Sequence, residues 1–367
     1  MLHQFHVLLP KAGNSFEEQC NDLHEQLFHL CEDNGLGLSQ LLMARCYFSD
    51  VANQRSLLEM HPLGRLLTNS GACSYVEQPP LHPGVKLALN LWFVPAADCR
   101  RRTVSVEEGM AVEVEAEGLT YLFHTMRPET YAADALDSKA QTELAFNRHI
   151  DLLKRYDMTL SRHCHRTWIY VRDVDCNYQG VVDGRNYIFR REGLTAATHF
   201  IASTGIGGAV RNAKTLSAID FLSVKGLDDG KVGYLHAPEF LNCTVEYGVA
   251  FERGTWLDLP SGRLFLISGT ASIDAHGNCL HEGDVLTQTG RLFVNIEKLL
   301  ASAGGRLADM QYMIVYLRDI ADYHDVSRYL RLRFPNIPFL ITEARVCRPQ
   351  WLIEVETMAF KPHQSQG

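Results

Sequence analysis

The sequence lacks the features that mark several large classes of protein. It has no run of the 18 or so apolar residues that a membrane-spanning helix requires, so we expect no membrane partner. Residues 1–10 lack the basic segment and the long apolar run of a secretory signal, and we therefore expect a cytoplasmic protein. The 35 Lys and Arg are outnumbered by 43 Asp and Glu, and a net charge of -8 predicts no nucleic-acid partner.

Motifs for disulfides, metals and nucleotides are also missing. The ten cysteines include no CxxC pair, which favours reduced thiols over a disulfide framework. His163 and His165 share a predicted strand, but no second pair of ligands follows at the spacing of a zinc site. The glycine-rich segment 203–208 has Val210 where a dinucleotide-binding loop needs its last glycine. The sequence therefore predicts no metal and no cofactor.

The sequence does contain one pattern three times, at 19–50, 141–173 and 288–319. Each copy starts with Gln, continues with apolar residues three or four apart, and ends in a strand-like segment followed by Asp. The spacing of three and four predicts a helix that buries one face, and aromatic and β-branched residues predict the strand. Long internal repeats of this kind indicate repeated structural units.

A second strand is predicted near the end of each copy, at 85–92, 216–222 and 352–358, after a shorter helix. We therefore predict an α+β fold of three β-β-α-β-α-β units. Their expected limits are 1–102, 103–232 and 233–367, because charge and glycine interrupt the apolar pattern near these points. Only 18 residues precede the first copy, so we expect that unit to be degenerate and to have lost part of its opening hairpin.

The third copy resembles the RidA/YjgF family over the family's full length. The similarity rests on 265–274, 283–289, the helix around Asn295, 315–319 and 353–359. Members of that family form homotrimers with ligand clefts between subunits, so the resemblance implies a pseudo-trimer within one chain, with the sheets inside and the helices outside. It also implies that the clefts have diverged and that one is active. Because the trimer is internal, we expect a monomer.

One subgroup of the family fits less well than another. RidA deaminases hold the substrate carboxylate with an arginine shortly after a proline, but here Leu340 follows Pro338 at that place, which argues against imine deamination. Residues 344–356, with several segments of the second copy, instead resemble the chorismatases, RidA-like enzymes that split chorismate into pyruvate and a cyclic or aromatic acid. This similarity covers residues 103–362. Chorismate is the small-molecule partner that it implies.

Chorismate carries two carboxylates, a ring hydroxyl and an enol ether, so its site needs cationic forks and hydroxyl or backbone donors. We align 201–207 of copy two with 341–347 of copy three as corresponding strands. Residues two apart on a strand lie on the same face. On this basis Arg345 and Cys347 are expected to point together. The substrate-binding residues that the resemblance implies are Arg345, Arg166, Tyr178, Arg185, Ser203, Thr204, Gly205 and Gly207.

Glu354 is the expected proton donor to the enolpyruvyl group. Burial beside the like-charged Glu356 on the same strand face would raise the pKa of Glu354, as an acid working near neutral pH requires. Protonation would give an oxocarbenium ion that collapses with loss of pyruvate. Glu356 is the alternative acid.

Chorismatases that form 3-hydroxybenzoate are similar to this chain in having a cysteine at the position of Cys347, seven residues before the acid, so Cys347 is expected to take part in catalysis. The favoured product is 3-hydroxybenzoate. Hydrolysis to a dihydroxycyclohexadiene carboxylate and mixed 3- and 4-hydroxybenzoate formation stay open. A different class also stays open, namely a non-catalytic RidA-like protein that binds a small carboxylate, because copy one keeps the pattern with Ala88 and Asn90 in place of the glutamates.

Overall fold

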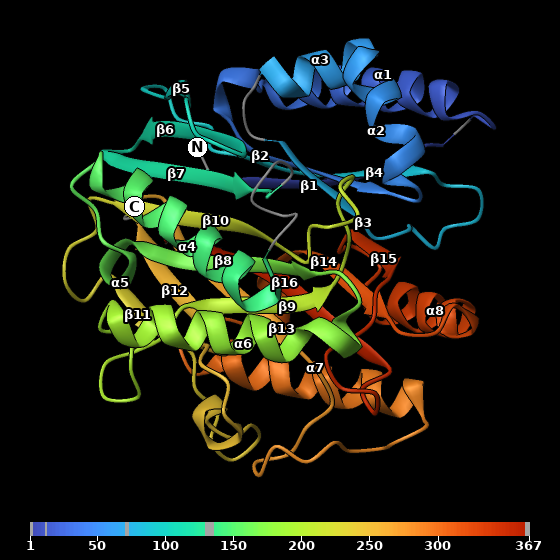
Figure 1. The fold of residues 1–367 in the computed structure, drawn as a ribbon. Coiled ribbons are helices and arrows are strands. Elements are labelled where there is room, and N and C mark those ends of the chain that lie inside the picture. The colour runs from blue at the N-terminus through green and yellow to red at the C-terminus, as the bar shows by residue number, and fades with distance from the viewer. Residues whose placement is uncertain (1–2, 12, 70–72, 129–135, 364–367) are drawn as a thin grey trace.

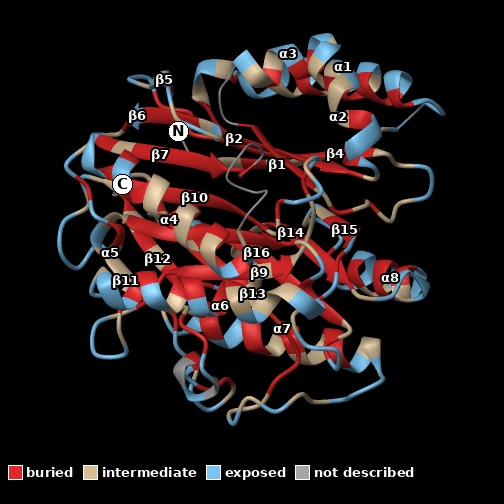
Figure 2. Cartoon of the chain, in the orientation of Figure 1, coloured by how far each residue is buried: buried red, intermediate tan, exposed pale blue. Residues whose placement is uncertain are grey.

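The computed structural model describes residues 3–11, 13–69, 73–128 and 136–363. Three sheets meet at the centre of the molecule, and helices cover their outer faces (Figure 1). The strands are mostly buried, while the helices keep an exposed outer side (Figure 2). The α+β prediction of three repeats with sheets inside and helices outside is therefore confirmed.

The first sheet has four strands in the order β1-β4-β2-β3. Its elements are β1 (Gln4–Leu8), α1 (Phe16–Asn34), β2 (Leu41–Phe48), α2 (Val51–Met60), α3 (Pro62–Asn69), β3 (Cys73–Glu77) and β4 (Leu87–Phe93).

The second and third sheets have six strands each, in the orders β5-β6-β7-β10-β8-β9 and β11-β12-β13-β16-β14-β15. The second unit contains β5 (Arg100–Val104), β6 (Gly109–Ala116), β7 (Leu119–Met126), α4 (Ser138–Lys154), α5 (Leu160–His163), β8 (Cys164–Val171), α6 (Val174–Arg191), β9 (Ala202–Gly207) and β10 (Ser217–Lys225). The third unit contains β11 (Val232–Tyr234), β12 (Gly254–Leu259), β13 (Gly262–Thr270), α7 (Val285–Ala301), β14 (Met310–Leu317), α8 (Tyr323–Arg333), β15 (Phe339–Glu343) and β16 (Ile353–Pro362).

These units differ from the predicted pattern in three details. The second and third units each have two strands more than the β-β-α-β-α-β pattern. One is the first strand of the unit, and the other comes directly before its last strand in the chain. In the described part of the first unit, β1 is the counterpart of β7 and β13. The two strands that precede β7 and β13 in the other units have no equivalent there. The second helix is not always the shorter one, because α6 has 18 residues and α4 has 17. Since β5 begins at Arg100 and β11 at Val232, we propose that the units join at 94–99 and 226–231.

The glutamine that starts each copy has the same structural role in all three units. Its buried side-chain amide donates to one backbone carbonyl and accepts from the backbone N–H two residues later, just before the last strand of the unit. This double hydrogen bond attaches the first helix to the final strand and explains why a glutamine recurs at this place in each unit. The pairs are Gln19 with Gly84 and Lys86, Gln141 with Lys214 and Leu216, and Gln288 with Gln350 and Leu352.

Strand registers show which positions of the units correspond. Arg45, Trp168 and Ile314 each lie five residues before the repeated Asp. They pair with Asn90, Asp220 and Glu356 on the last strands, which makes these three positions equivalent. Two residues earlier on the same strands stand Ala88, Ala218 and Glu354. Only the third unit therefore carries a carboxyl group at the position of the predicted acid.

The same registers correct the alignment of 201–207 with 341–347. Trp168 pairs with Thr204 and the equivalent Ile314 pairs with Leu340, so the true offset is 136 residues rather than 140. The two segments are neighbours instead of equivalents, because the Gly207 N–H donates to the carbonyl of Arg345 at 2.9 Å. The alignment failed because the units differ in the length of the segment between helix and strand.

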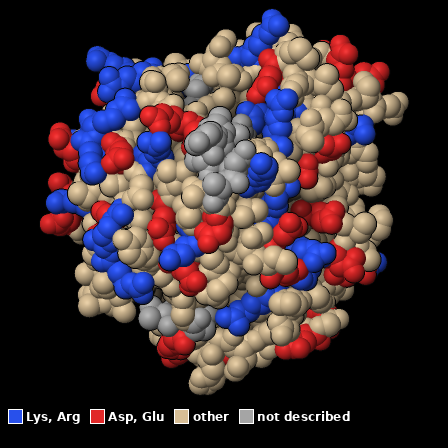
Figure 3. Space-filling view, in the orientation of Figure 1, with Lys and Arg blue, Asp and Glu red and all other residues tan. Residues whose placement is uncertain are grey.

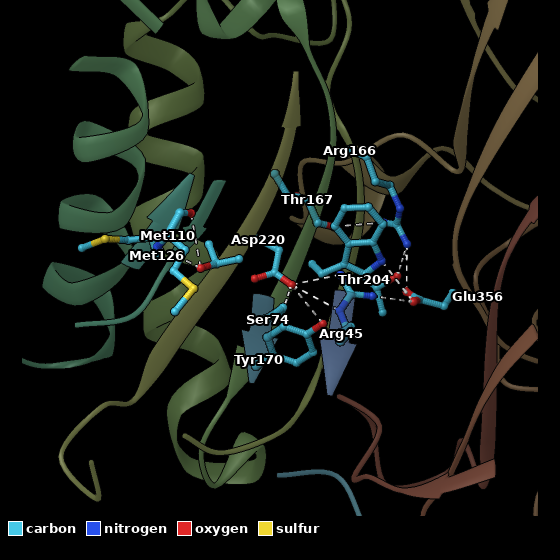
Figure 4. Close-up of polar contacts among 12 residues, drawn as sticks. Arg45, Ser74, Met110, Met126, Arg166, Thr167, Tyr170, Thr204, Asp220 and Glu356 are labelled. Carbon is cyan, nitrogen blue, oxygen red and sulfur yellow. Dashed lines mark hydrogen bonds and ion pairs between the residues drawn. The ribbon is translucent and has the colours of Figure 1, made fainter. Parts of the chain in front are cut away.

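A buried ion network occupies the place where the three sheets meet (Figure 4). Asp220 accepts hydrogen bonds from Arg45 at 2.9 Å, Arg127 at 2.6 Å and Ser74 at 2.6 Å. Glu356 accepts from Arg166 at 2.9 Å and from the Trp168 indole at 3.0 Å, and Arg45 lies 3.8 Å from it. Because these charges are buried and paired, removal of one partner would leave an uncompensated charge in the core.

The surface carries charges of both signs without a dominant basic area on the face shown in Figure 3. Among the described residues, no helix is both long and apolar enough to cross a bilayer.

Candidate active site

A cleft lies between the second and third units, where α6 and β9 of one unit face β13 and β16 of the other. We call it the Glu354 cleft. It is narrow in this structure, with about 50 Å³ accessible to the centre of a water-sized sphere. Its lining residues are Tyr178, Arg185, Ser203, Gly205, Val249, Phe251, Arg253, Gly269, Ala271, Ile273, Cys347, Arg348, Trp351 and Glu354.

Glu354 contributes a buried carboxyl group from β16 to the floor of the cleft. Its residue surface is 5% exposed. Burial, and secondly the nearby charge of Glu356, raise the pKa of Glu354 to about 8, although Arg166 and Arg253 act in the opposite direction. Glu354 therefore holds a proton at neutral pH, which is the state that a general acid needs.

Gly269 makes room for that carboxyl group. A Cβ atom at residue 269 would stand 1.9 Å from Glu354 Oε1 and 2.7 Å from its Cδ, so any larger residue would displace the acid. The Gly269 N–H also donates to Thr204 Oγ1 at 3.0 Å, across the boundary between the two units. The sequence contained this glycine within a family motif but did not indicate its contact with the acid.

Cys347 and Tyr178 form a neutral pair at the wall of the cleft. Burial, with the charge of Glu354, raises the pKa of Cys347 to about 12, so its sulfur is a thiol and not a thiolate. The thiol and the Tyr178 hydroxyl are hydrogen-bonded. Gly205 faces the Tyr178 ring, since a Cβ atom there would lie 3.1 Å from it. The glycine therefore accommodates a side chain of its own unit.

Three arginines supply positive charge to the cleft. The guanidinium groups of Arg185 and Arg253 lie 5.9 Å and 5.2 Å from the centre of the Phe251 ring. Arg348 lies 5.4 Å from the Trp351 ring. Sequence reasoning predicted only Arg185 among them. Arg348 stood inside the motif that resembles chorismatases, whereas nothing in the sequence singled out Arg253 or Phe251.

Six of the ten predicted site residues line the cleft together. They are Glu354, Cys347, Tyr178, Arg185, Ser203 and Gly205. Their roles stay predictions, because the structure shows only that they line the same cleft.

Arg166 and Thr204 lie one layer behind the cleft. The Arg166 guanidinium donates to Glu356 and to Thr204 Oγ1, and Thr204 in turn accepts from the Gly269 N–H. The side chain of Arg166 is 2% exposed, so it does not line the cleft in this structure. Its position links the central ion network to the backbone beside the acid. Glu356, the alternative acid, is held by Arg166 and Trp168 in that network.

Arg345 and Gly207 lie at the outer edge of the same unit boundary. The Arg345 side chain is 66% exposed and forms an ion pair with Asp175 at 2.7 Å. A Cβ atom on Gly207 would stand 2.9 Å from the Arg345 backbone, so the glycine permits close packing of two segments of the chain. Arg345 and Cys347 both contact α6, through Asp175 and Tyr178, but only Cys347 lines the Glu354 cleft.

No group of three His, Cys, Asp or Glu side chains within the described ranges is placed to hold a metal ion.

The fold and the cleft together define a pseudo-trimer of RidA-like units with one acid-bearing site between two of them. The model of the endoribonuclease L-PSP family matches residues 258–361. The 3-aminoacrylate deaminase RutC of Acinetobacter baylyi is 31% identical over 99 residues, which cover 25% of this chain and 75% of that protein. The chain therefore belongs to this family, as the RidA-like motifs predicted.

The similarity to chorismatases extends beyond the third unit. A chorismatase of Streptomyces hygroscopicus is 26% identical over 213 residues, covering 53% of this chain and 60% of that protein. A crystal structure of a chorismatase superposes with a TM-score of 0.68 at 19% identity and covers 98% of both chains. The whole fold of the chain, and not only its third unit, is thus shared with a chorismatase.

Proposed function

We propose that the protein is a chorismatase, in which Glu354 protonates the enolpyruvyl group of chorismate. The observation that carries the proposal is a carboxyl group with a pKa of about 8 in a cleft that three arginines line. A protonated carboxylic acid suits transfer of a proton to an enol ether. The similarity in sequence and fold to chorismatases supports the same substrate.

The arginines match the two carboxylates of chorismate. Guanidinium groups bind carboxylates through two parallel hydrogen bonds, and burial strengthens such contacts. Arg185 and Arg253 both lie near the Phe251 ring and are 2% and 7% exposed, so they are largely shielded from water. We assign the carboxylate contacts to Arg185, Arg253 and Arg348 and a hydroxyl contact to Ser203, which also lines the cleft.

The reaction begins when Glu354 gives its proton to the methylene carbon of the enol ether. The side chain becomes an oxocarbenium ion, whose positive charge the ionised Glu354 carboxylate stabilises. Attack of water on this cation releases pyruvate and leaves a dihydroxycyclohexadiene carboxylate. In the other route the ring hydroxyl attacks the ring carbon that carries the side chain, pyruvate leaves, and the hydroxyl proton returns to the Glu354 carboxylate. The resulting ring epoxide then opens and isomerises to an aromatic acid.

We favour the second route and 3-hydroxybenzoate as its product. This product and pyruvate together contain all the atoms of chorismate, so no water is consumed overall. The Cys347 thiol lies beside Tyr178 in the cleft and keeps its proton at neutral pH, so it can donate or relay a proton during ring opening.

Incubation of the purified protein with chorismate tests the proposal. We expect one pyruvate per chorismate, measured with a coupled dehydrogenase, and 3-hydroxybenzoate identified by chromatography. Absence of pyruvate would reject the enzyme, and binding of a benzoate without turnover would support the non-catalytic carboxylate-binding alternative.

Cys347→Ala tests the choice of product. If the thiol assists the intramolecular route, the variant should still release pyruvate but form less aromatic acid per pyruvate and more of the non-aromatic diol. The ratio is read from ultraviolet absorbance against the pyruvate assay. An unchanged ratio would show that Cys347 serves only packing.

A further inference from the structure

Asn242 is a hydrogen-bond partner of Arg253, one of the arginines that line the Glu354 cleft. Arg253 lines the Glu354 cleft and also a neighbouring cavity, and Asn242 lines that second cavity. Arg253 Nη2 donates to Asn242 Oδ1 at 3.1 Å and to its backbone carbonyl at 3.3 Å. Both residues are buried, with 5% of Asn242 and 7% of Arg253 exposed. One asparagine therefore supplies two acceptors to the same guanidinium nitrogen.

The amide group of Asn242 is itself oriented by its neighbours. Its Nδ2 donates to Glu246 Oε2 at 3.3 Å, which leaves Oδ1 for the arginine. A Cβ atom on Gly277 would stand 2.6 Å from Asn242 Nδ2, and this glycine has a φ of +78°, so only glycine fits easily there. The amide is thus enclosed by a hydrogen bond on one side and by close backbone packing on another.

An arginine that must bind a carboxylate gains from being held in place before the ligand arrives, because ordering a long flexible side chain costs binding free energy. We propose that Asn242 is a positioning residue that holds the Arg253 guanidinium toward the Glu354 cleft, ready to bind a carboxylate of the substrate. The proposal rests on the proposed function, because it assumes that the ligand of this cleft is a carboxylate such as chorismate.

The position of Arg253 should also influence the acid. The charged and titratable groups around Glu354 are Glu356 and Arg166 behind it, Cys347 and Tyr178 on one wall, and Arg185, Arg253 and Arg348 within the cleft. Because Arg253 favours the ionised carboxylate, its displacement would let the pKa of Glu354 rise. The alkaline limb of kcat/KM would then move to higher pH, a change that a purely structural role of Asn242 would not produce.

Asn242→Leu tests the proposal, since leucine has a similar volume but no acceptor. We expect KM for chorismate and the dissociation constant for benzoate to rise about tenfold, as loss of a charge-assisted hydrogen bond implies, with kcat changed less than about threefold. Asn242→Asp restores an acceptor and should recover at least about a third of the lost benzoate affinity. Asn278→Leu, in an exposed turn closed by Asp274, is the matched control and should leave all three constants unchanged.

The proposal would be overturned if Asn242→Leu left KM, benzoate affinity and the alkaline limb of kcat/KM unchanged while Arg253→Leu altered all three. If Asn242→Leu does not fold, Asn242→Ala replaces it, and failure of both would assign Asn242 a structural role instead. Loss of benzoate affinity in Asn242→Leu without pyruvate release by the wild type would keep the positioning role and reject only the proposed enzyme.

Discussion

Two clefts of this molecule occupy corresponding places but have different chemistry. The Glu354 cleft lies between units two and three. A second cleft lies between units one and two, and its lining residues are Arg55, Cys73, Tyr75, Glu108, Gly109, Met110, Thr125 and Arg127. We call it the Tyr75 cleft. The registers make Cys73 equivalent to Ser203 and Tyr75 equivalent to Gly205, so the same strand edge forms both clefts.

The difference lies in a few side chains rather than in the backbone. Where the Glu354 cleft has its acid, the unit that closes the Tyr75 cleft has Ala218. Tyr75 stands where the Glu354 cleft has Gly205, and the Arg55 guanidinium lies 5.1 Å from the centre of its ring. Arg127 is committed to the ion pair with Asp220 at 2.6 Å, and Arg55 to one with Glu59 at 2.9 Å. The comparison indicates that the fold needs the strand pairing and the central charges, whereas the chemistry needs one glutamate and its surroundings.

Loss of the acid should give the largest effect. Glu354→Gln keeps the size of the side chain but removes the transferable proton, so the rate of pyruvate release should fall at least about 100-fold. Binding of benzoate should persist, which a titration would show. Activity near that of the wild type would mean that another group in the cleft is the acid and would remove the main difference between the two clefts.

Gly269→Ala should give the next largest effect, because its Cβ atom would stand 1.9 Å from Glu354 Oε1. We expect kcat to fall roughly tenfold or more, as small displacements of catalytic groups do. Gly290→Ala in α7 is the control, since its nearest neighbour would be the Tyr329 hydroxyl at 3.7 Å. That control should keep its activity and gain up to about 1 kcal/mol of stability. Equal kcat values for Gly269→Ala and Gly290→Ala would show that residue 269 does not constrain the Glu354 carboxyl group.

The raised pKa of Glu354 predicts a pH dependence of both rate and stability. The acid must be protonated, so kcat/KM should decline as pH rises through about 8. Because burial raises the pKa above its unfolded value, the neutral carboxyl is favourable for folding at low pH, and this advantage is lost as pH rises from about 4.5 to about 8. Glu354→Gln should therefore gain stability relative to the wild type between pH 5 and pH 8, on the order of 1–3 kcal/mol in denaturant titrations. If the difference in unfolding free energy between the variant and the wild type did not change with pH, Glu354 would lie in a more hydrated site.

The smallest effect is expected in the Tyr75 cleft. Arg55→Leu should leave kcat and KM for chorismate within about twofold of the wild type, because the equivalent position of the acid there is Ala218. Arg185→Leu in the Glu354 cleft should raise KM about tenfold or more, as loss of a charged contact to a carboxylate implies. Equal effects of the two substitutions on chorismate turnover would show that both clefts act in the reaction.

The sequence by itself determined the repeated helices and strands, because spacing along a helix or strand depends on near neighbours in the chain. The glutamine at the start of each copy and the spacing of Cys347 and Glu354 were visible for the same reason. Tertiary structure decided which side chains share the cleft. Arg166 pairs with Glu356 of the third unit, Arg345 pairs with Asp175 near the surface, and Arg253 lines the cleft from a segment outside the repeated pattern. The two ion pairs join residues 190 and 170 positions apart, and no local spacing in the chain specifies them.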